Sequence, residues 1–218
     1  MSFRGLTMRQ AWRFGGGPLK FGIALVLKAI AFKGPRQRLP TYSVELKCDE
    51  KDISSIDNHT FLAEVSKAID LGYAEGYFYR ATEVLDPNVI DGYSYLALHR
   101  DRKRSIFIGA IRRRTAILGC TVTVTGSLRT VESDDIEFAG HRFYLDAPPP
   151  SKRIRVSSDD LTAVDSAMED YMRRHQAIPF ADFGELKRHA EIVSDRAFDA
   201  RVDRGLFVYE NESVIRRG

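Results

Sequence analysis

Apolar and polar residues alternate along residues 93–125, which predicts a series of consecutive strands. Three runs show this period of two, with tight basic breaks between them: YSYLALH, SIFIGAI and AILGCTVTVT. The middle run, residues 106–111, is apolar on both sides apart from Gly109, so we expect both of its faces to be covered. Shorter runs of this kind predict further strands at residues 41–48, 75–81 and 136–145.

Apolar residues at helical spacing predict three helices in the same part of the chain. Residues 61–69 form the first, which Gly72 should end and which should pack on the aliphatic face of the sheet. Ser157 and Asp160 form a capping-box pattern for the second. The third should begin near Asp182.

The order of these elements, a helix, a meander of strands and two more helices, favours an α+β architecture. We expect a mostly antiparallel sheet of about five strands packed with helices, plus a basic N-terminal helical segment. The predicted organisation is a basic apolar segment at residues 1–40, an α+β domain at residues 41–210 and a tail at residues 211–218. Seven residues are expected in the core: Val65, Ile69, Leu96, Ile108, Val122, Val164 and Met168.

The amino-acid composition gives few indications of a catalytic, metal or cofactor site. The 218 residues, 44% of them hydrophobic, are enough for a core of ordinary size. The two cysteines, Cys48 and Cys120, form no disulfide framework, and Cys120 lies on an apolar strand face typical of an inert thiol. No phosphate loop, zinc-ligand pair or nucleophile elbow occurs, so we expect no cofactor and no metal.

Two histidines have a carboxylate close by in the sequence, His99 with Asp101 and His141 with Asp146. Such a pair can act as acid and base when a fold brings it together. No nucleophile, base and orienting residue stand out together, however. We therefore predict a binding or interaction module rather than an enzyme, with a hydrolase-type His/carboxylate site as an alternative.

Charge is unevenly distributed. Residues 1–44 contain eight Lys and Arg residues and no acid. Further basic runs lie in two turns, residues 100–104 and 112–114, but a strand of about eight residues should hold these turns about 26 Å apart. Binding of nucleic acid by these turns is thus a lesser alternative. The acidic residues around Asp135 are expected to form a solvated turn rather than a cation site.

Residues 19–32 are apolar nearly all round and would form a helix of roughly 21 Å, shorter than the ~30 Å core of a bilayer. We hypothesise that residues 1–38 attach the domain to an anionic membrane surface. The expected membrane-binding residues are Arg9, Trp12, Arg13, Lys20, Phe21, Ile23, Leu27, Lys28 and Lys33.

Other interpretations of this segment stay open. The helix could be buried on the second face of the sheet, or it could cross a membrane with Lys28 snorkelling. It could also belong to a signal peptide cleaved at residues 29–31, or to a transit peptide. The expected location is accordingly the cytoplasm, peripheral to a membrane, with export or organelle targeting as the alternative; a protein partner is also left open.

Overall fold

The computed structural model describes residues 7–8, 12, 18–30, 45–48, 53, 59–81, 89–113, 120–140, 151–158 and 160–203. The helices are α2 (Pro18–Ala29), α3 (His59–Asp70), α4 (Leu161–Met172) and α5 (Phe183–Asp203). The strands are β1 (Glu45–Cys48), β2 (Glu75–Ala81), β3 (Val89–Leu98), β4 (Arg104–Arg113), β5 (Cys120–Thr130), β6 (Ile136–Ala139), β7 (Lys152–Arg155) and β8 (Ala177–Ile178).

The strands form one sheet in the order β1-β2-β3-β4-β5-β6-β7, with β8 paired to the end of β5. All neighbours are antiparallel except β6 and β7. The predicted α+β class and mostly antiparallel sheet are confirmed. In the described part of the chain the sheet has eight strands, where about five were expected. Two of them could not be read from alternation, because β7 (KRIR) is too charged and β8 has only two residues.

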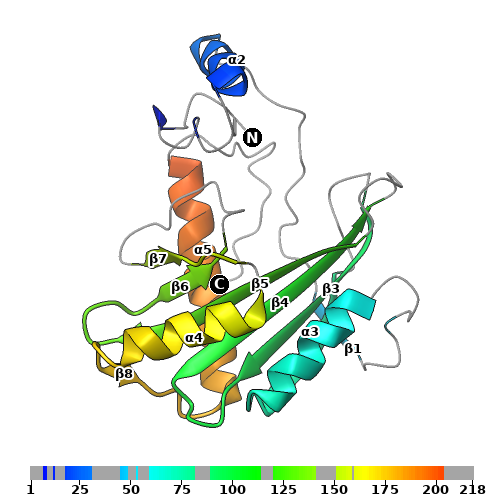
Figure 1. The fold of residues 1–218 in the computed structure, drawn as a ribbon, viewed down its shortest axis with the longest axis vertical. Coiled ribbons are helices and arrows are strands. Elements are labelled where there is room, and N and C mark those ends of the chain that lie inside the picture. Colours follow the sequence, from blue (N-terminus) through cyan, green and yellow to red (C-terminus); the bar gives the residue numbers. More distant parts are fainter. Residues whose placement is uncertain are drawn as a thin grey trace.

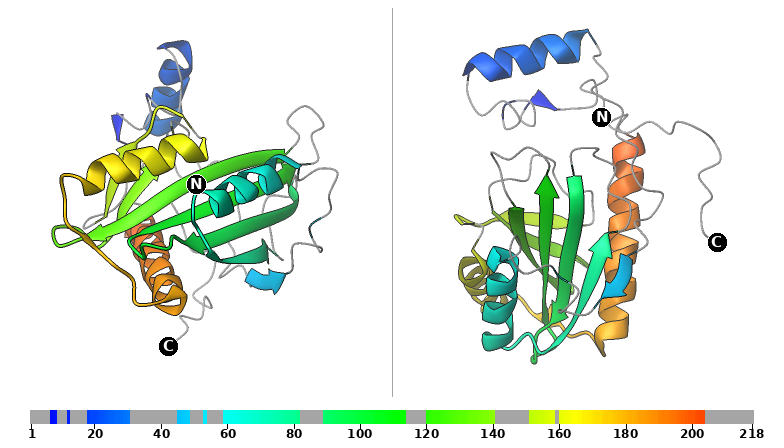
Figure 2. Two further views of the ribbon diagram at one scale, coloured as in Figure 1. Left: turned by 60° about the horizontal axis from the view of Figure 1, so that its bottom comes forward. Right: turned by 90° about the vertical axis from the view of Figure 1, so that its right-hand side faces the viewer.

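The molecule has three layers around this sheet (Figure 1). Helices α3 and α4 lie on one face and α5 lies on the other, as the side view shows (Figure 2). One face of the central strand β4 is buried under α3 and α4, but Phe107 on its other face is 40% exposed, so the expectation that both faces are covered is met only in part. The interpretation that buried the N-terminal helix on the second face is wrong, because apolar side chains of α2 such as Leu19 and Ile23 remain exposed, and α5 packs on β3 at that face.

The main core lies under α3 and α4. Ile106 and Ile108 of β4 are buried there, and Ile108 is in register with Val124 of β5 and with Tyr95 of β3. The face of β3 that carries Tyr95 thus packs against α3 and α4. Leu98, on the aliphatic face of β3, packs under α5. The prediction that α3 packs on the aliphatic face is wrong for β3. Both faces of this strand are covered, so alternation does not tell which face α3 contacts.

Most of the predicted core is confirmed. Four of its members are fully buried: Val65, Ile108, Val164 and Met168. Leu96 and Val122 are partly buried and pack against the core clusters. The prediction that Ile69 lies in the core is wrong, because 50% of its surface is exposed. Helix α3 buries instead the face formed by Phe61, Val65 and Ala68.

Gly72 ends α3, as predicted. Its φ of 100° lies in the left-handed region that favours glycine. Its amide donates to the Ile69 carbonyl at 3.0 Å, and the Tyr73 amide donates to the Ala68 carbonyl at 3.0 Å. These two bonds form a Schellman motif, which turns the chain directly into β2.

Of the two predicted helix starts, the one at α5 is confirmed and the one at α4 is wrong. Asp182 caps α5 as expected, since its carboxylate accepts a bond of 2.7 Å from the Glu185 amide. The capping box at Ser157 is wrong. Helix α4 begins at Leu161 with Asp160 as N-cap, and the Asp160 side chain makes no capping bond.

Gly126 provides a test of the packing between α4 and β5. A Cβ atom at Gly126 would lie 2.8 Å from Cγ1 of Val164 and 2.6 Å from Sδ of Met168. We expect Gly126→Ala to lower the free energy of unfolding by about 1–3 kcal/mol, measured by urea denaturation. Gly22→Ala, where no atom lies within 4 Å, serves as the control. Equal stability of both variants would contradict this packing.

Candidate functional site

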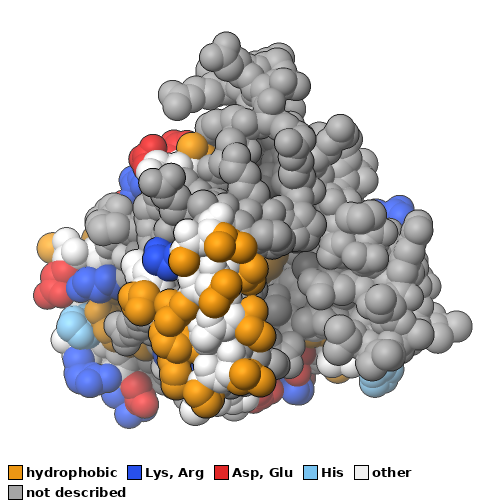
Figure 3. Space-filling model, turned by 90° about the horizontal axis from the view of Figure 1, so that it is seen from above, with side chains coloured by type: hydrophobic (Ala, Val, Ile, Leu, Met, Phe, Trp, Pro, Cys, Tyr) orange, Lys and Arg blue, Asp and Glu red, His pale blue; other side chains and the backbone are white. Residues whose placement is uncertain are grey.

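Helix α2 turns a row of apolar side chains to the outside, the apolar stripe. Its members have exposed fractions of 54–80%: Leu19, Ile23 and Val26 in α2, and Ile30 directly after it, whose amide still donates to the Val26 carbonyl. They follow one another at steps of four, three and four residues, so they share one face of the helix. Ala24, on the opposite face, is 2% exposed. Figure 3 looks onto this end of the molecule and shows hydrophobic side chains gathered over α2.

Trp12 packs on the other side of α2, because Phe21 lies on the helix face opposite the apolar stripe. Its ring meets the Phe21 ring edge to face, with centroids 5.0 Å apart, and half of its surface remains exposed. Met8, four residues earlier, is also exposed. The segment before α2 thus adds two large apolar side chains to the same end of the molecule.

The predicted membrane-binding residues divide into four groups. Trp12 and Ile23 are exposed, and three others are half-buried: Phe21, Leu27 and Lys28. The side chain of Lys20 is not described. The remaining residues lie outside the described part of the chain: Arg9, Arg13 and Lys33. Sequence reasoning missed Leu19, Val26 and Ile30, although their four-three-four spacing was readable in the sequence.

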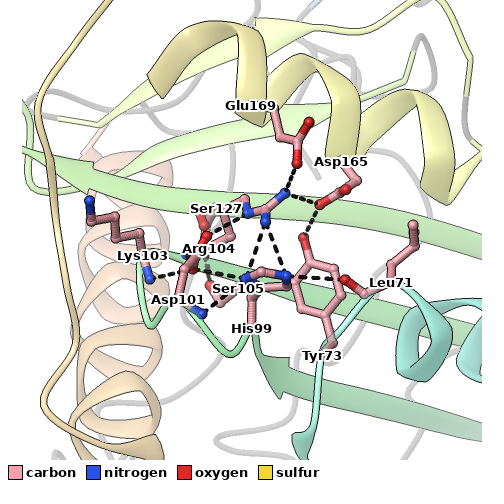
Figure 4. A network of polar contacts seen from close by, with 10 residues as sticks. All are labelled: Leu71, Tyr73, His99, Asp101, Lys103, Arg104, Ser105, Ser127, Asp165 and Glu169. Carbon is pink, nitrogen blue, oxygen red and sulfur yellow. Dashed lines mark hydrogen bonds and ion pairs between the residues drawn. The ribbon is translucent and has the colours of Figure 1, made fainter. Parts of the chain in front are cut away.

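A second candidate site is a group of polar side chains around Arg104, which we call the Arg104 network (Figure 4). The guanidinium is buried at the start of β4. Its Nε donates to Asp101 at 2.9 Å, and its Nη1 donates to Asp165 and to Glu169, each at 2.9 Å. One cation therefore meets three carboxylates, two of them on α4.

His99 completes one side of the Arg104 network. Its Nε2 lies 3.1 Å from the Leu71 carbonyl oxygen and 3.0 Å from Nη2 of Arg104. Its Nδ1 lies 3.1 Å from the Asp101 amide nitrogen, 3.2 Å from Nη2 of Arg104 and 3.0 Å from the Asp101 carboxylate. Neighbouring protein groups therefore engage both ring nitrogens.

Three groups of the Arg104 network have shifted pKa values. Burial alone would lower the pKa of Arg104, but the charge of Asp165 and its other partners outweigh burial and raise it. Burial, together with the charge of Asp165, raises the pKa of Tyr73, whose hydroxyl donates to that carboxylate at 2.5 Å. Partial burial alone would raise the pKa of Asp101. Hydrogen bonds from the Lys103 amide and from His99 outweigh burial, with help from the charge of Arg104, and leave this pKa below its ordinary value.

The structure thus brings His99 and Asp101 together, as an acid/base pair requires. His141 and Asp146 lie outside the described residues. In the Arg104 network, however, both ring nitrogens of His99 already meet protein groups, and the ring is largely buried. We interpret the network as a clamp between the β3–β4 hairpin, α3 and α4.

The sequence predicted a solvated turn around Asp135, but part of this turn is buried. Ser133 and Asp135 are both buried, and the Ser133 hydroxyl donates to the Asp135 carbonyl at 3.0 Å. Burial raises the pKa of the Asp135 carboxyl to about 6, although a hydrogen bond with Ser151 opposes the shift. Within the described residues no group of three or more His, Cys, Asp or Glu side chains is arranged to hold a metal ion.

The two basic turns lie at opposite ends of β4, as predicted. The first joins β3 to β4 at residues 99–103, and Arg112 and Arg113 stand at the far end of β4. Arg102 is already engaged, because its Nη1 donates to the Ala181 carbonyl at 2.7 Å. Arg114 lies outside the described residues.

Replacing Arg104 tests the clamp. Arg104→Met leaves Asp165 buried without its cation, so we expect the free energy of unfolding to fall by about 3–5 kcal/mol. Lys103→Met, at an exposed neighbouring position, should change it little. Thermal and urea unfolding would measure both. Similar stability of the two variants would remove the clamp interpretation.

The raised pKa of Asp135 predicts a pH dependence of stability. The folded protein holds a proton on this carboxyl up to about pH 6, whereas the unfolded chain loses it near pH 4. Between these values the folded state binds more protons, so stability should fall as pH rises, by about 1–3 kcal/mol. Asp135→Asn should abolish this fall in urea titrations at pH 4–7, and Glu132→Gln should preserve it. A fall that persists in Asp135→Asn would assign it to another group.

No protein-family model, curated protein or solved structure matches the chain. In the part of the chain that the structure describes, no helix has the length and apolar character needed to cross a membrane.

Proposed function

We propose that residues 1–38 attach the α+β domain to an anionic membrane surface, and that the domain acts there as a binding module. The observation that carries this proposal is the apolar stripe of α2, whose four side chains are 54–80% exposed. Each such side chain gains about 1.5–3 kcal/mol when it is fully buried in an apolar phase. A helix that leaves four of them in water is therefore suited to a surface that can cover them.

The geometry of α2 suits a helix that lies in the plane of the membrane. Its twelve residues extend about 18 Å, and the stripe gathers its apolar side chains on one side. Trp12 and Phe21 place aromatic rings on the opposite side of α2, and tryptophan is a type enriched at membrane interfaces. A helix of this kind buries one face at the boundary between headgroups and acyl chains.

Charge identifies the kind of surface. Residues 1–44 contain eight Lys and Arg residues and no acid. Each basic residue close to an anionic leaflet contributes about 1 kcal/mol of attraction. Apolar contact and electrostatic attraction would thus act on the same segment, a combination that gives stable peripheral binding.

A second copy of the chain is the main competitor for the stripe. Steps of four, three and four residues also suit two helices that pair along a seam, with Ile23 and Ile30 at equivalent heptad positions. Two copies would, however, bring sixteen cations together without any acid in the paired segments. This repulsion favours a lipid surface with negative headgroups over a second basic helix.

Vesicle binding tests the proposal. We expect the full chain to sediment with phosphatidylcholine vesicles that contain phosphatidylserine, and less with phosphatidylcholine alone. Ile23→Ser/Val26→Ser should weaken binding at least tenfold, because it removes apolar contact at unchanged charge. Trp12 is the one tryptophan of the chain, so its emission should shift to the blue when vesicles are added.

The matched control is Ile69→Ser/Ile192→Ser, which changes two equally large side chains, each 50% exposed, on α3 and α5. This variant should bind as the parent does. A full chain that stays in the supernatant at low salt would refute the proposal. So would a dimer in vesicle-free sedimentation that Ile23→Ser/Val26→Ser dissociates, which would identify a second copy as the occupant of the stripe.

A further inference from the structure

The exposed side of α2 carries no charge among the side chains that the structure describes. Gly22 lies four residues before Val26 and Ala29 lies three residues after it, so these two small residues widen the apolar stripe along one edge. Each exposed residue of this segment is apolar or a glycine: Pro18, Leu19, Gly22, Ile23, Val26 and Ala29 in α2, and Ile30 directly after it. This side of the helix can therefore bind a surface by apolar contact but not by charge.

The lysines of α2 lie on another side of the helix. Lys28 is half-buried and follows Ala24 by four residues, and Ala24 is 2% exposed. Lys20 precedes Ala24 by four residues, so its position belongs to the same side. Both lysine positions are thus on the buried side of the helix, away from the surface that the stripe would meet.

Charge attraction and apolar insertion depend differently on the state of a lipid surface. Attraction between basic residues and anionic headgroups acts over about 8–10 Å at physiological salt and needs no space between the headgroups. Apolar side chains of a helix in the plane of the membrane must instead enter between the headgroups, to a depth of roughly 5–10 Å. Such insertion is easier where lipids are loosely packed, as on a strongly curved bilayer.

We propose that α2 directs the domain to loosely packed, strongly curved parts of an anionic membrane. The inference rests on the proposed function and adds which lipid surface is chosen. The eight cations of residues 1–44 would recognise the charge of the headgroups, whereas the uncharged exposed side of α2 would recognise how loosely the headgroups pack.

The test compares small sonicated vesicles with large extruded vesicles of one phosphatidylcholine/phosphatidylserine composition, by flotation of the full chain in a density gradient. At equal accessible lipid, we expect binding to the small vesicles to be tighter on the order of tenfold. Higher salt should weaken binding to both sizes but leave their ratio in place, because the ratio arises from apolar contact.

Two variants that each add one cation separate packing from charge. Ala29→Lys places the cation on the exposed side of α2, at a helical position that lysine suits, and should bring the ratio between the two vesicle sizes toward one. Ser194→Lys places the same charge at an exposed position of α5 and should leave the ratio as it is in the parent.

The outcomes distinguish this inference from the function on which it rests. Equal binding of the parent to both vesicle sizes, with binding still lost in Ile23→Ser/Val26→Ser, would refute the inference and leave attachment through α2 standing. A size preference that Ala29→Lys and Ser194→Lys reduce equally would assign the preference to net charge and overturn the inference. A parent chain that binds neither vesicle size would refute both proposals.

Discussion

A buried guanidinium determines how three parts of the chain meet. Arg104 stands at the start of β4, and its donors reach Asp101 in the hairpin and both Asp165 and Glu169 on α4. Removing a charge from water costs several kcal/mol unless its partners are in place. Tyr73, directly after α3, donates to the same Asp165. The hairpin, α3 and α4 are therefore stable together, and separating any of them leaves a buried charge poorly paired.

Arginines also hold the opposite layer in place. Here they bind backbone carbonyls, and Arg129 also pairs with Glu185 of α5. Arg129 donates to the Pro179 carbonyl at 2.7 Å, and its guanidinium lies over the Phe180 ring, 4.0 Å from the centroid. Arg102 donates to the Ala181 carbonyl and accepts, through its own carbonyl, a bond from the Phe180 amide. These bonds lead the chain from α4 around the sheet end to α5. A basic hairpin can thus serve the fold itself, which its sequence alone does not distinguish from binding a partner.

The sequence predicted helices and strands better than it predicted which of them contact one another. Gly72 and Asp182 were recognised because helix ends use local chemistry, a left-handed glycine and a side-chain cap within three residues. Of the Arg104 network only the pair of His99 and Asp101 was recognised, because the other contacts join residues up to 92 positions apart. Strand β7 was missed because its edge position lets charged residues replace the alternating pattern. The N-terminal segment was recognised by composition, but its exposed face became visible only with the helix in place.

Spacing alone does not say which way an apolar face points. Helix α3 buries Phe61, Val65 and Ala68 against the sheet at steps of four and three residues. Helix α2 shows the same steps, yet its stripe is exposed. The difference follows from the sheet, because α3 and α4 already cover one face and α5 packs on the other. The apolar face of α2 is therefore surplus to the core of the domain, and its free energy of burial is available to a surface outside the molecule.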